Sequence, residues 1–240
     1  MKNLVLLLLI CTPAYADWNV SVGPEVSHIT YDEKNLVFGG KAVDMKEEGV
    51  MYGVHGILEH QDRLYLAIDG RYSQGEVDYS GTGTIEGIKD YTYEAKGLVG
   101  LPYQKVVFYT GYGYRYLNDN SQGMLTSTGL LGYERESTYH YVPIGAKLTL
   151  DKLTFRAEID ALITGEQISH LEVYGPFEPQ VRNKQNRGVG FKASVDYTYK
   201  NVVFGPFIRT WKIQNSKRND DFLEPKNTSF EVGGQISVKF

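Results

Sequence analysis

The 240-residue sequence predicts an all-β fold, namely a transmembrane antiparallel up-and-down β-barrel of about ten strands. The chain falls into runs in which apolar and polar residues alternate, as expected for strands with one apolar face. Each run is long enough to cross a bilayer at a tilt of about 45°. Tight turns and long polar loops connect the runs in strict alternation, which is typical of short periplasmic turns and long extracellular loops. Eight or twelve strands also fit, because sequence-based boundaries shift by several residues.

The alternating runs follow one another along the whole chain after its first segment. They span 18–30, 48–60, 63–77, 89–101, 105–117, 137–150, 153–163, 187–199, 202–213 and 227–240. Tight turns are expected near 61–62, 102–104, 151–152 and 200–201, and polar loops at 31–46, 78–88, 118–136, 164–186 and 214–226. No apolar stripe with a helical period and caps interrupts the series. An even strand number would return both chain ends to the periplasmic side.

The last run, residues 227–240, shows the alternation most clearly and keeps it to the terminal Phe240. One face carries Phe230, Val232, Gly234, Ile236, Val238 and Phe240, and the other carries Ser229, Glu231, Gly233, Gln235, Ser237 and Lys239. This stretch resembles the closing strand of bacterial outer-membrane β-barrels, in which an apolar-alternating segment ending in Phe is a targeting and assembly signal. The resemblance implies an integral outer-membrane protein of a Gram-negative bacterium, with Phe240 read by the barrel-assembly machinery.

The first sixteen residues have the features of a secretory signal peptide. Lys2 supplies the positive charge, residues 4–10 form the apolar segment, and Ala14-Tyr15-Ala16 matches the cleavage pattern. We therefore expect a signal peptide at 1–16 and a barrel domain at 17–240. The single cysteine, Cys11, lies in the leader, which argues against disulfides, thiol catalysis and zinc–cysteine sites in the mature chain.

The composition fits a membrane barrel, with 19 Tyr and 26 Gly and a mean hydropathy of −0.33. Low hydropathy is expected when only alternate residues face lipid. The net charge of −4 comes without a basic stripe, so no nucleic-acid partner is expected. Aromatic residues should form interfacial girdles. The periplasmic girdle is predicted from Trp18, Tyr103, Tyr197 and Phe240, and the outer one from Tyr31, Tyr52, Tyr72, Tyr91, Tyr93, Tyr112, Tyr114, Tyr116, Tyr139 and Trp211.

The alternation also sorts the charged residues of the runs onto the face opposite to the apolar one. A charge facing lipid at the membrane midplane would cost about 2–4 kcal/mol, so this face should line the lumen. The predicted lumen charge network contains the acids Glu25, Glu59, Asp69, Glu94, Glu158, Asp160, Asp196 and Glu231, and the bases Arg71, Lys96, Arg115, Lys147, Arg156, Lys192, Arg209 and Lys239. The two sets balance, and the lumen of about ten strands is narrow. A paired network that plugs it is the main expectation, and a selective channel lining is the alternative.

The functional hypotheses follow from this architecture. The leading one is a non-enzymatic surface or structural protein that binds ligands or partners through its extracellular loops. A small selective porin-like channel is the second, and a hydrolase acting at the rim on peptides or lipid is the third. In strand count, length and terminal Phe the chain resembles the omptin proteases and the Opc-type adhesins, yet it has no D-x-D or D-x-H motif of the omptin kind.

We predict no catalytic residue, no cofactor and no metal site from the sequence. The expected surroundings and partners are outer-membrane lipid and lipopolysaccharide, the barrel-assembly machinery at the C-terminal strand, and a surface ligand held by the loops. Those loops, 118–136 and 164–186, carry apolar residues among polar ones.

Overall fold

The computed structural model describes residues 18–38, 41–175, 180–217 and 223–240. The predicted signal peptide at 1–16 lies outside these residues, as does Asp17, the expected start of the mature chain.

Antiparallel strands form a closed ring, in which each strand pairs with its neighbours in the chain, with one exception given below, and the first pairs with the last. The strands are β1 (Trp18–Phe38), β2 (Lys41–Gln61), β3 (Tyr65–Ser80), β4 (Thr84–Tyr103), β5 (Val106–Asn120), β6 (Glu134–Leu150), β7 (Leu153–His170), β8 (Gln180–Gln185), β9 (Gly188–Tyr199), β10 (Val202–Ile213) and β11 (Asn227–Lys239). The short β8 and then β9 pair with successive parts of β7, so together they form one wall of the ring. The prediction of a ten-stranded up-and-down barrel is confirmed.

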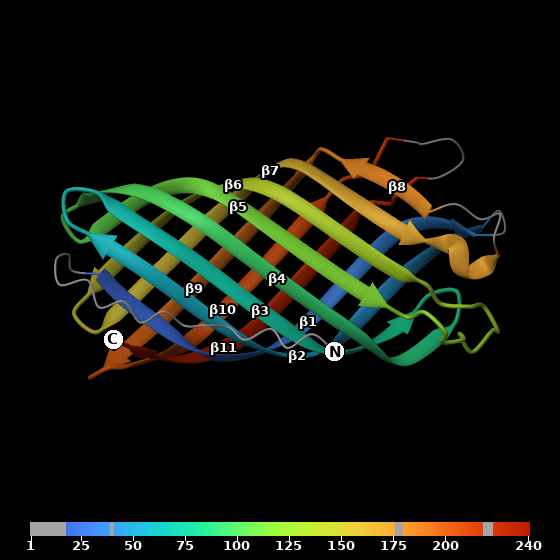
Figure 1. Cartoon of the computed structure of the whole chain (residues 1–240), viewed down its shortest axis with the longest axis horizontal. Helices are drawn as coiled ribbons and strands as arrows, with labels where there is room; N and C mark the ends of the chain where they lie inside the picture. The colour runs from blue at the N-terminus through green and yellow to red at the C-terminus, as the bar shows by residue number, and fades with distance from the viewer. Residues whose placement is uncertain (1–17, 39–40, 176–179, 218–222) are drawn as a thin grey trace, which may run out of the picture.

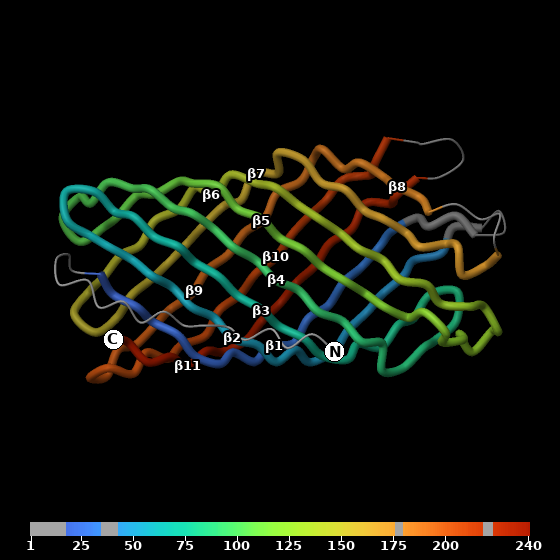
Figure 2. The backbone as a smooth tube through the Cα atoms, viewed as in Figure 1, coloured from blue at the N-terminus to red at the C-terminus, as the bar shows by residue number. Residues whose placement is uncertain are grey.

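The two ends of the barrel differ, as Figure 1 shows. Tight turns and the C-terminus lie at one end, and longer hairpins extend at the other. Figure 2 shows the blue and red ends of the chain side by side, where β1 pairs with β11. Positive φ angles in three of the tight turns, at Gln104, Asp151 and Lys200, produce the reversal.

The strands run further at the hairpin end than the alternation predicts. The expected loop 31–46 is largely strand, because β1 reaches Phe38 and β2 begins at Lys41. The expected loop 118–136 shrinks to 121–133, and 164–186 contains the end of β7, the 3-10 turn η1 (Leu171–Tyr174) and β8. β1 has 21 residues, about twice the 9–11 that a transmembrane strand needs. The extension lies above the membrane, where both faces of a strand can be polar and no alternation marks it.

A belt of exposed apolar side chains surrounds the barrel. It includes Val22, Val54, Ile68, Phe108 and Ile236, which are 42–62% exposed. On β2 the belt ends between the exposed Val50 and the ion pair of Lys46 with Glu48. Exposed apolar side chains on every wall fit lipid and not water, so the fold is that of an integral outer-membrane barrel. Among the described residues, no helix has the length and apolarity needed to cross a bilayer.

The predicted outer girdle is only partly correct. A chain of ring contacts on the exterior joins Tyr72, Tyr91, Tyr116, Tyr93, Tyr114, His140 and Tyr112. Tyr139 and Trp211, by contrast, are 3% and 2% exposed and pack together inside the barrel. Tyr31 also lies inside, beneath the guanidinium of Arg135. The assignment of these three to the girdle was wrong. The rings of Tyr139 and Trp211 fill space in the lumen beside Gly165 and Gly190 on neighbouring strands, and Tyr31 packs against Arg135.

Candidate functional site

The central part of the lumen is crossed by a four-residue ion-pair cluster, here called the central cluster. Arg71 on β3 lies between two acids, with Nη2 2.7 Å from Glu25 Oε1 and 2.6 Å from Glu231 Oε1. Arg209 on β10 contacts the same two acids at 2.9 and 3.2 Å. Ser27 donates a further hydrogen bond to Glu231 over 2.7 Å. Each charge of the central cluster therefore has two partners of opposite sign in a buried position.

A second group, the lysine cluster, joins opposite walls. Lys192 on β9 pairs with Glu94 on β4, and its Nζ lies 3.1 Å from Asp160 Oδ2 on β7. Lys96 on β4 contacts Glu158 on β7 at 2.9 Å and Asp69 on β3 at 3.4 Å. Because β4 and β9 are separated by three strands in the ring, the Lys192–Glu94 pair spans the lumen.

The third group, the periplasmic cluster, lies toward the tight turns. Lys147 on β6 reaches Glu59 on β2 at 2.9 Å, and Arg156 on β7 contacts Asp196 on β9 at 2.7 Å. Arg156 also approaches Glu59 at 3.8 Å. The two contacts to Glu59 join walls that are not neighbours in the ring, whereas Arg156 and Asp196 lie on the paired strands β7 and β9.

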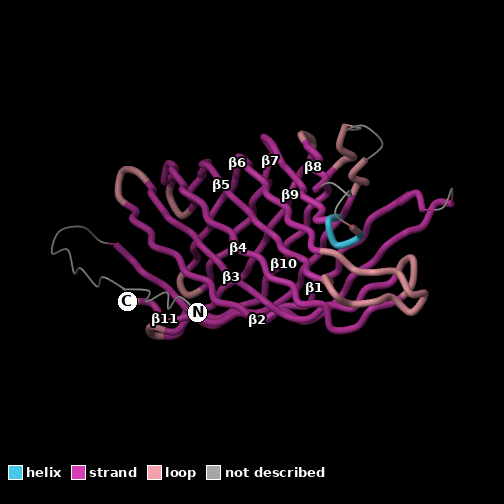
Figure 3. The backbone as a smooth tube through the Cα atoms, turned by 45° about the vertical axis from the view of Figure 1, so that its right-hand side comes forward, coloured by secondary structure: helices cyan, strands magenta, loops and turns pink. Residues whose placement is uncertain are grey.

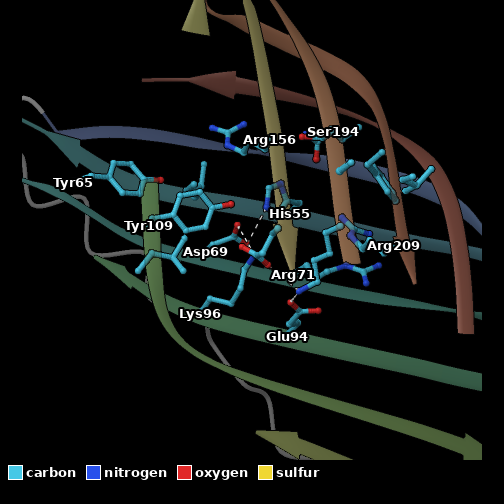
Figure 4. Close-up of a pocket in the computed structure, with 18 residues that line it drawn as sticks. His55, Tyr65, Asp69, Arg71, Glu94, Lys96, Tyr109, Arg156, Ser194 and Arg209 are labelled. Carbon is cyan, nitrogen blue, oxygen red and sulfur yellow. Dashed lines mark hydrogen bonds and ion pairs between the residues drawn. The ribbon is translucent and has the colours of Figure 1, made fainter. Parts of the chain in front are cut away.

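A small cavity of about 80 Å³ remains between these clusters. Figure 4 shows the side chains that project into it, including Arg71, Glu94, Lys96, Arg156 and Arg209. His55 lies there with its Nε2 3.2 Å from Asp69 Oδ1. This His–Asp contact was not predicted, because it joins adjacent strands at diagonal positions. It lies within the ion-pair network and not at the rim.

Most residues of the predicted lumen network make ion pairs with one another. Arg115 instead lies over the ring of Trp211, 5.6 Å from its centroid, and is buried. Lys239 is exposed at the end of β11, and no ion pair joins it to the described residues. The terminal Phe240 is 75% exposed, and its backbone N–H donates to Val20 O over 2.8 Å.

Above the membrane belt, one base is surrounded by acids in what we call the chamber cluster. Arg135 on β6 contacts Glu33 on β1 at 3.0 Å, Glu47 on β2 at 2.7 Å and Asp119 on β5 at 2.6 Å. Since β6 and β1 lie on opposite sides of the ring, these contacts span the barrel mouth. Glu33 and Glu47 are 2% and 5% exposed. Sequence analysis placed these residues in loops or left them out. The available signal was the alternation itself, since Glu33 falls on the same strand face as Ile29, Glu47 on that of Met51 and Arg135 on that of Tyr139.

The loop between β5 and β6, residues 121–133, folds over this end and is pinned to the β3–β4 hairpin. Ser127 N–H donates to Thr84 O over 2.9 Å, and Thr84 N–H donates back to Ser127 Oγ over 3.0 Å. Thr128 Oγ1 donates to Thr82 O over 2.6 Å. Tyr174 of η1 donates a short hydrogen bond to Leu131 O. Figure 3 shows η1 and the loops gathered at this end of the barrel. The loop thus roofs the space above the chamber cluster.

A further group lies at the lip of the barrel, where Glu134, Glu136 and His170 have ligand atoms within 4.8 Å of one another. Sequence analysis found no metal-ligand spacing, because these residues come from two strands. Gln180 Oε1 accepts a hydrogen bond from Arg182 over 2.8 Å. The amide nitrogen of Gln180 therefore faces His170 Nδ1, which lies 3.2 Å from it. A neutral His170 then carries its proton on Nε2, the atom nearest to Glu136. In that tautomer Nε2 carries a hydrogen in place of the lone pair that a metal ion would need, and at 3.7 Å from Glu136 it makes no hydrogen bond with the described residues.

Comparison with known proteins gives likeness in fold alone. No protein-family model matches the chain, and no curated protein sequence matches it. Three similar structures are the translocator domain of autotransporter NalP from Neisseria meningitidis (11% identity, 96% of this chain and 90% of that chain, TM-score 0.42), the beta domain of the Bordetella autotransporter Brka (11%, 89% and 98%, 0.41) and Neisserial surface protein A (12%, 93% and 97%, 0.34). With such low identities and TM-scores, nothing about function follows from these matches.

Proposed function

We propose that the protein is a non-enzymatic outer-membrane barrel with a closed lumen, which binds a ligand or partner through its extracellular part. The observation that carries this proposal is the set of ion pairs that cross the lumen between distant walls. A barrel of about this size is narrow enough for side chains to fill. Opening a path would require breaking buried ion pairs and leaving their charges unpaired, which is strongly unfavourable.

The extracellular part supports the second half of the proposal. The strands continue above the belt, and the loop 121–133 is held by defined hydrogen bonds over the barrel mouth. A rigid scaffold that presents ordered loops is the usual arrangement of binding proteins. Lipopolysaccharide around the barrel and the assembly machinery at the C-terminal strand remain the partners that we propose for the membrane-embedded surface.

Single-channel recording in a planar bilayer tests the closed lumen. We expect no steady openings from the refolded wild-type chain, with heat-modifiable gel migration as the control that folded barrel is present. Steady openings of the folded protein would overturn the closed lumen. They would favour a selective channel through the cavity between the clusters, with Arg156, whose side chain is 27% exposed, as the first residue to test for ion selectivity.

A further inference from the structure

A second cavity, of about 230 Å³, lies at the extracellular end between the chamber cluster and the loop 121–133, and we call it the chamber. Its walls are mainly apolar or aromatic and come from Met45, Ile85, Ile88, Leu130, Tyr133 and Tyr174. Glu33, Glu47, Asp119 and Arg135 also line it. An apolar pocket with a few converging polar groups is the usual form of a small-molecule site.

Within the chamber cluster almost every hydrogen-bond donor has a partner, whereas some of the acceptor oxygens have none. The Arg135 guanidinium donates through Nε and Nη2 to Asp119 Oδ2, through Nη2 to Glu47 Oε1, and through Nη1 to Glu33 Oε1. Four of its five N–H groups are thereby used. Asp119 Oδ1 is buried, and no described residue donates a hydrogen bond to it.

Glu47 adds a second unused acceptor. Its side chain is 6% exposed and lines the chamber, with Oε1 on Arg135. None of the described residues donates a hydrogen bond to its other oxygen. Three carboxylates therefore share one guanidinium, and Arg135 is the only base among the described residues that line the chamber. The chamber therefore carries an excess of negative charge, and its one guanidinium is already engaged by acids.

We infer that the chamber binds a small organic monocation, a primary ammonium group carried on an apolar or aromatic body. The ammonium group would donate a hydrogen bond to the free oxygen of Glu47, which shares Arg135 with Asp119, and the body would occupy the space beneath Leu130, Tyr133 and Tyr174. An anion would meet a guanidinium that is already occupied by acids. This inference deepens the proposed function, on which it rests, by naming a ligand class for the extracellular part.

The probe for the test is phenethylamine, which is cationic at neutral pH, and phenethyl alcohol is its neutral counterpart of similar shape. Isothermal titration of the full refolded chain in detergent should show saturable binding of the amine and much weaker binding of the alcohol. Glu47→Gln keeps the shape and the bond to Arg135 but removes the charge, and we expect it to weaken amine binding about tenfold or more. Glu86→Gln is the matched control, because Glu86 is exposed on the β3–β4 hairpin.

Three results would overturn the inference: no saturable amine binding by the wild type, equal binding of the alcohol, or unchanged affinity in Glu47→Gln. Heat-modifiable migration shows whether each variant is folded. The failure of this inference differs from failure of the proposed function. If the protein shows neither channel openings nor amine binding, the ligand class is ruled out and the closed lumen stands. If it shows steady openings and also binds the amine, the closed lumen is ruled out and the ligand class stands.

Discussion

In the central cluster two bases face two acids, and every charge has two partners. In the chamber cluster one base faces three acids. The first lies within the membrane-spanning lumen, where an unpaired buried charge is costly because water does not solvate it. The second lies above the belt and lines the chamber, the cavity for which we propose a ligand. The difference suggests that matched charges close the barrel and that unmatched charges mark the part that binds.

The comparison is tested most severely by removing a base from the lumen. Arg71→Ala leaves Glu25 and Glu231 with Arg209 alone, and we expect it to lower the free energy of unfolding by about 3–5 kcal/mol. Urea unfolding in lipid vesicles, followed by tryptophan fluorescence, would measure the loss. Lys46→Ala is the control, because it breaks an exposed ion pair with Glu48 and should leave the unfolding midpoint unchanged. A similar midpoint for the two variants would contradict a closed lumen held by ion pairs.

Packing provides a second contrast between the two regions. A Cβ at Gly113 would lie 2.2 Å from the ring of Tyr141 inside the lumen, so Gly113→Ala should cost about 1–3 kcal/mol. Gly97→Ala on the neighbouring strand meets no atom within 4 Å and should be nearly neutral in the same unfolding assay. Leu130→Phe should be tolerated too, because the chamber has room for the added atoms. Equal costs for Gly113→Ala and Gly97→Ala would show that the lumen is less tightly packed than described.

Sequence alternation predicted the ring of strands and the lumen face, since charges on that face cannot point into lipid. It could not predict partners such as Lys192 and Glu94, because the pairing across the lumen depends on how distant strands are staggered in the closed ring. The chamber escaped prediction for a different reason. At Glu47 and Glu48 both faces of β2 are polar, so the hydropathy pattern ends while the strand continues.

The smallest effect, and the most specific, is the pH dependence of Glu47. Burial raises the pKa of the Glu47 carboxyl well above its ordinary value, Asp119 raises it further, and Arg135 opposes both. Asp90 and Glu33 face the same group and also raise this pKa. A raised pKa in the folded state means that folding favours the protonated acid, so this stabilisation is present below the ordinary pKa and is lost as the pH rises through the raised value.

Glu47→Gln removes this titration, so the variant should gain stability relative to the wild type as the pH rises. Urea unfolding at a series of pH values would measure the difference, with Glu86→Gln as the exposed control. A bound ammonium group should favour the ionised form of Glu47. Amine binding to the wild type should therefore release protons, and the heat of binding should vary with the ionisation enthalpy of the buffer. A binding heat independent of the buffer would mean that Glu47 is already ionised in the empty chamber, and the two unfolding curves would then stay parallel across the pH series.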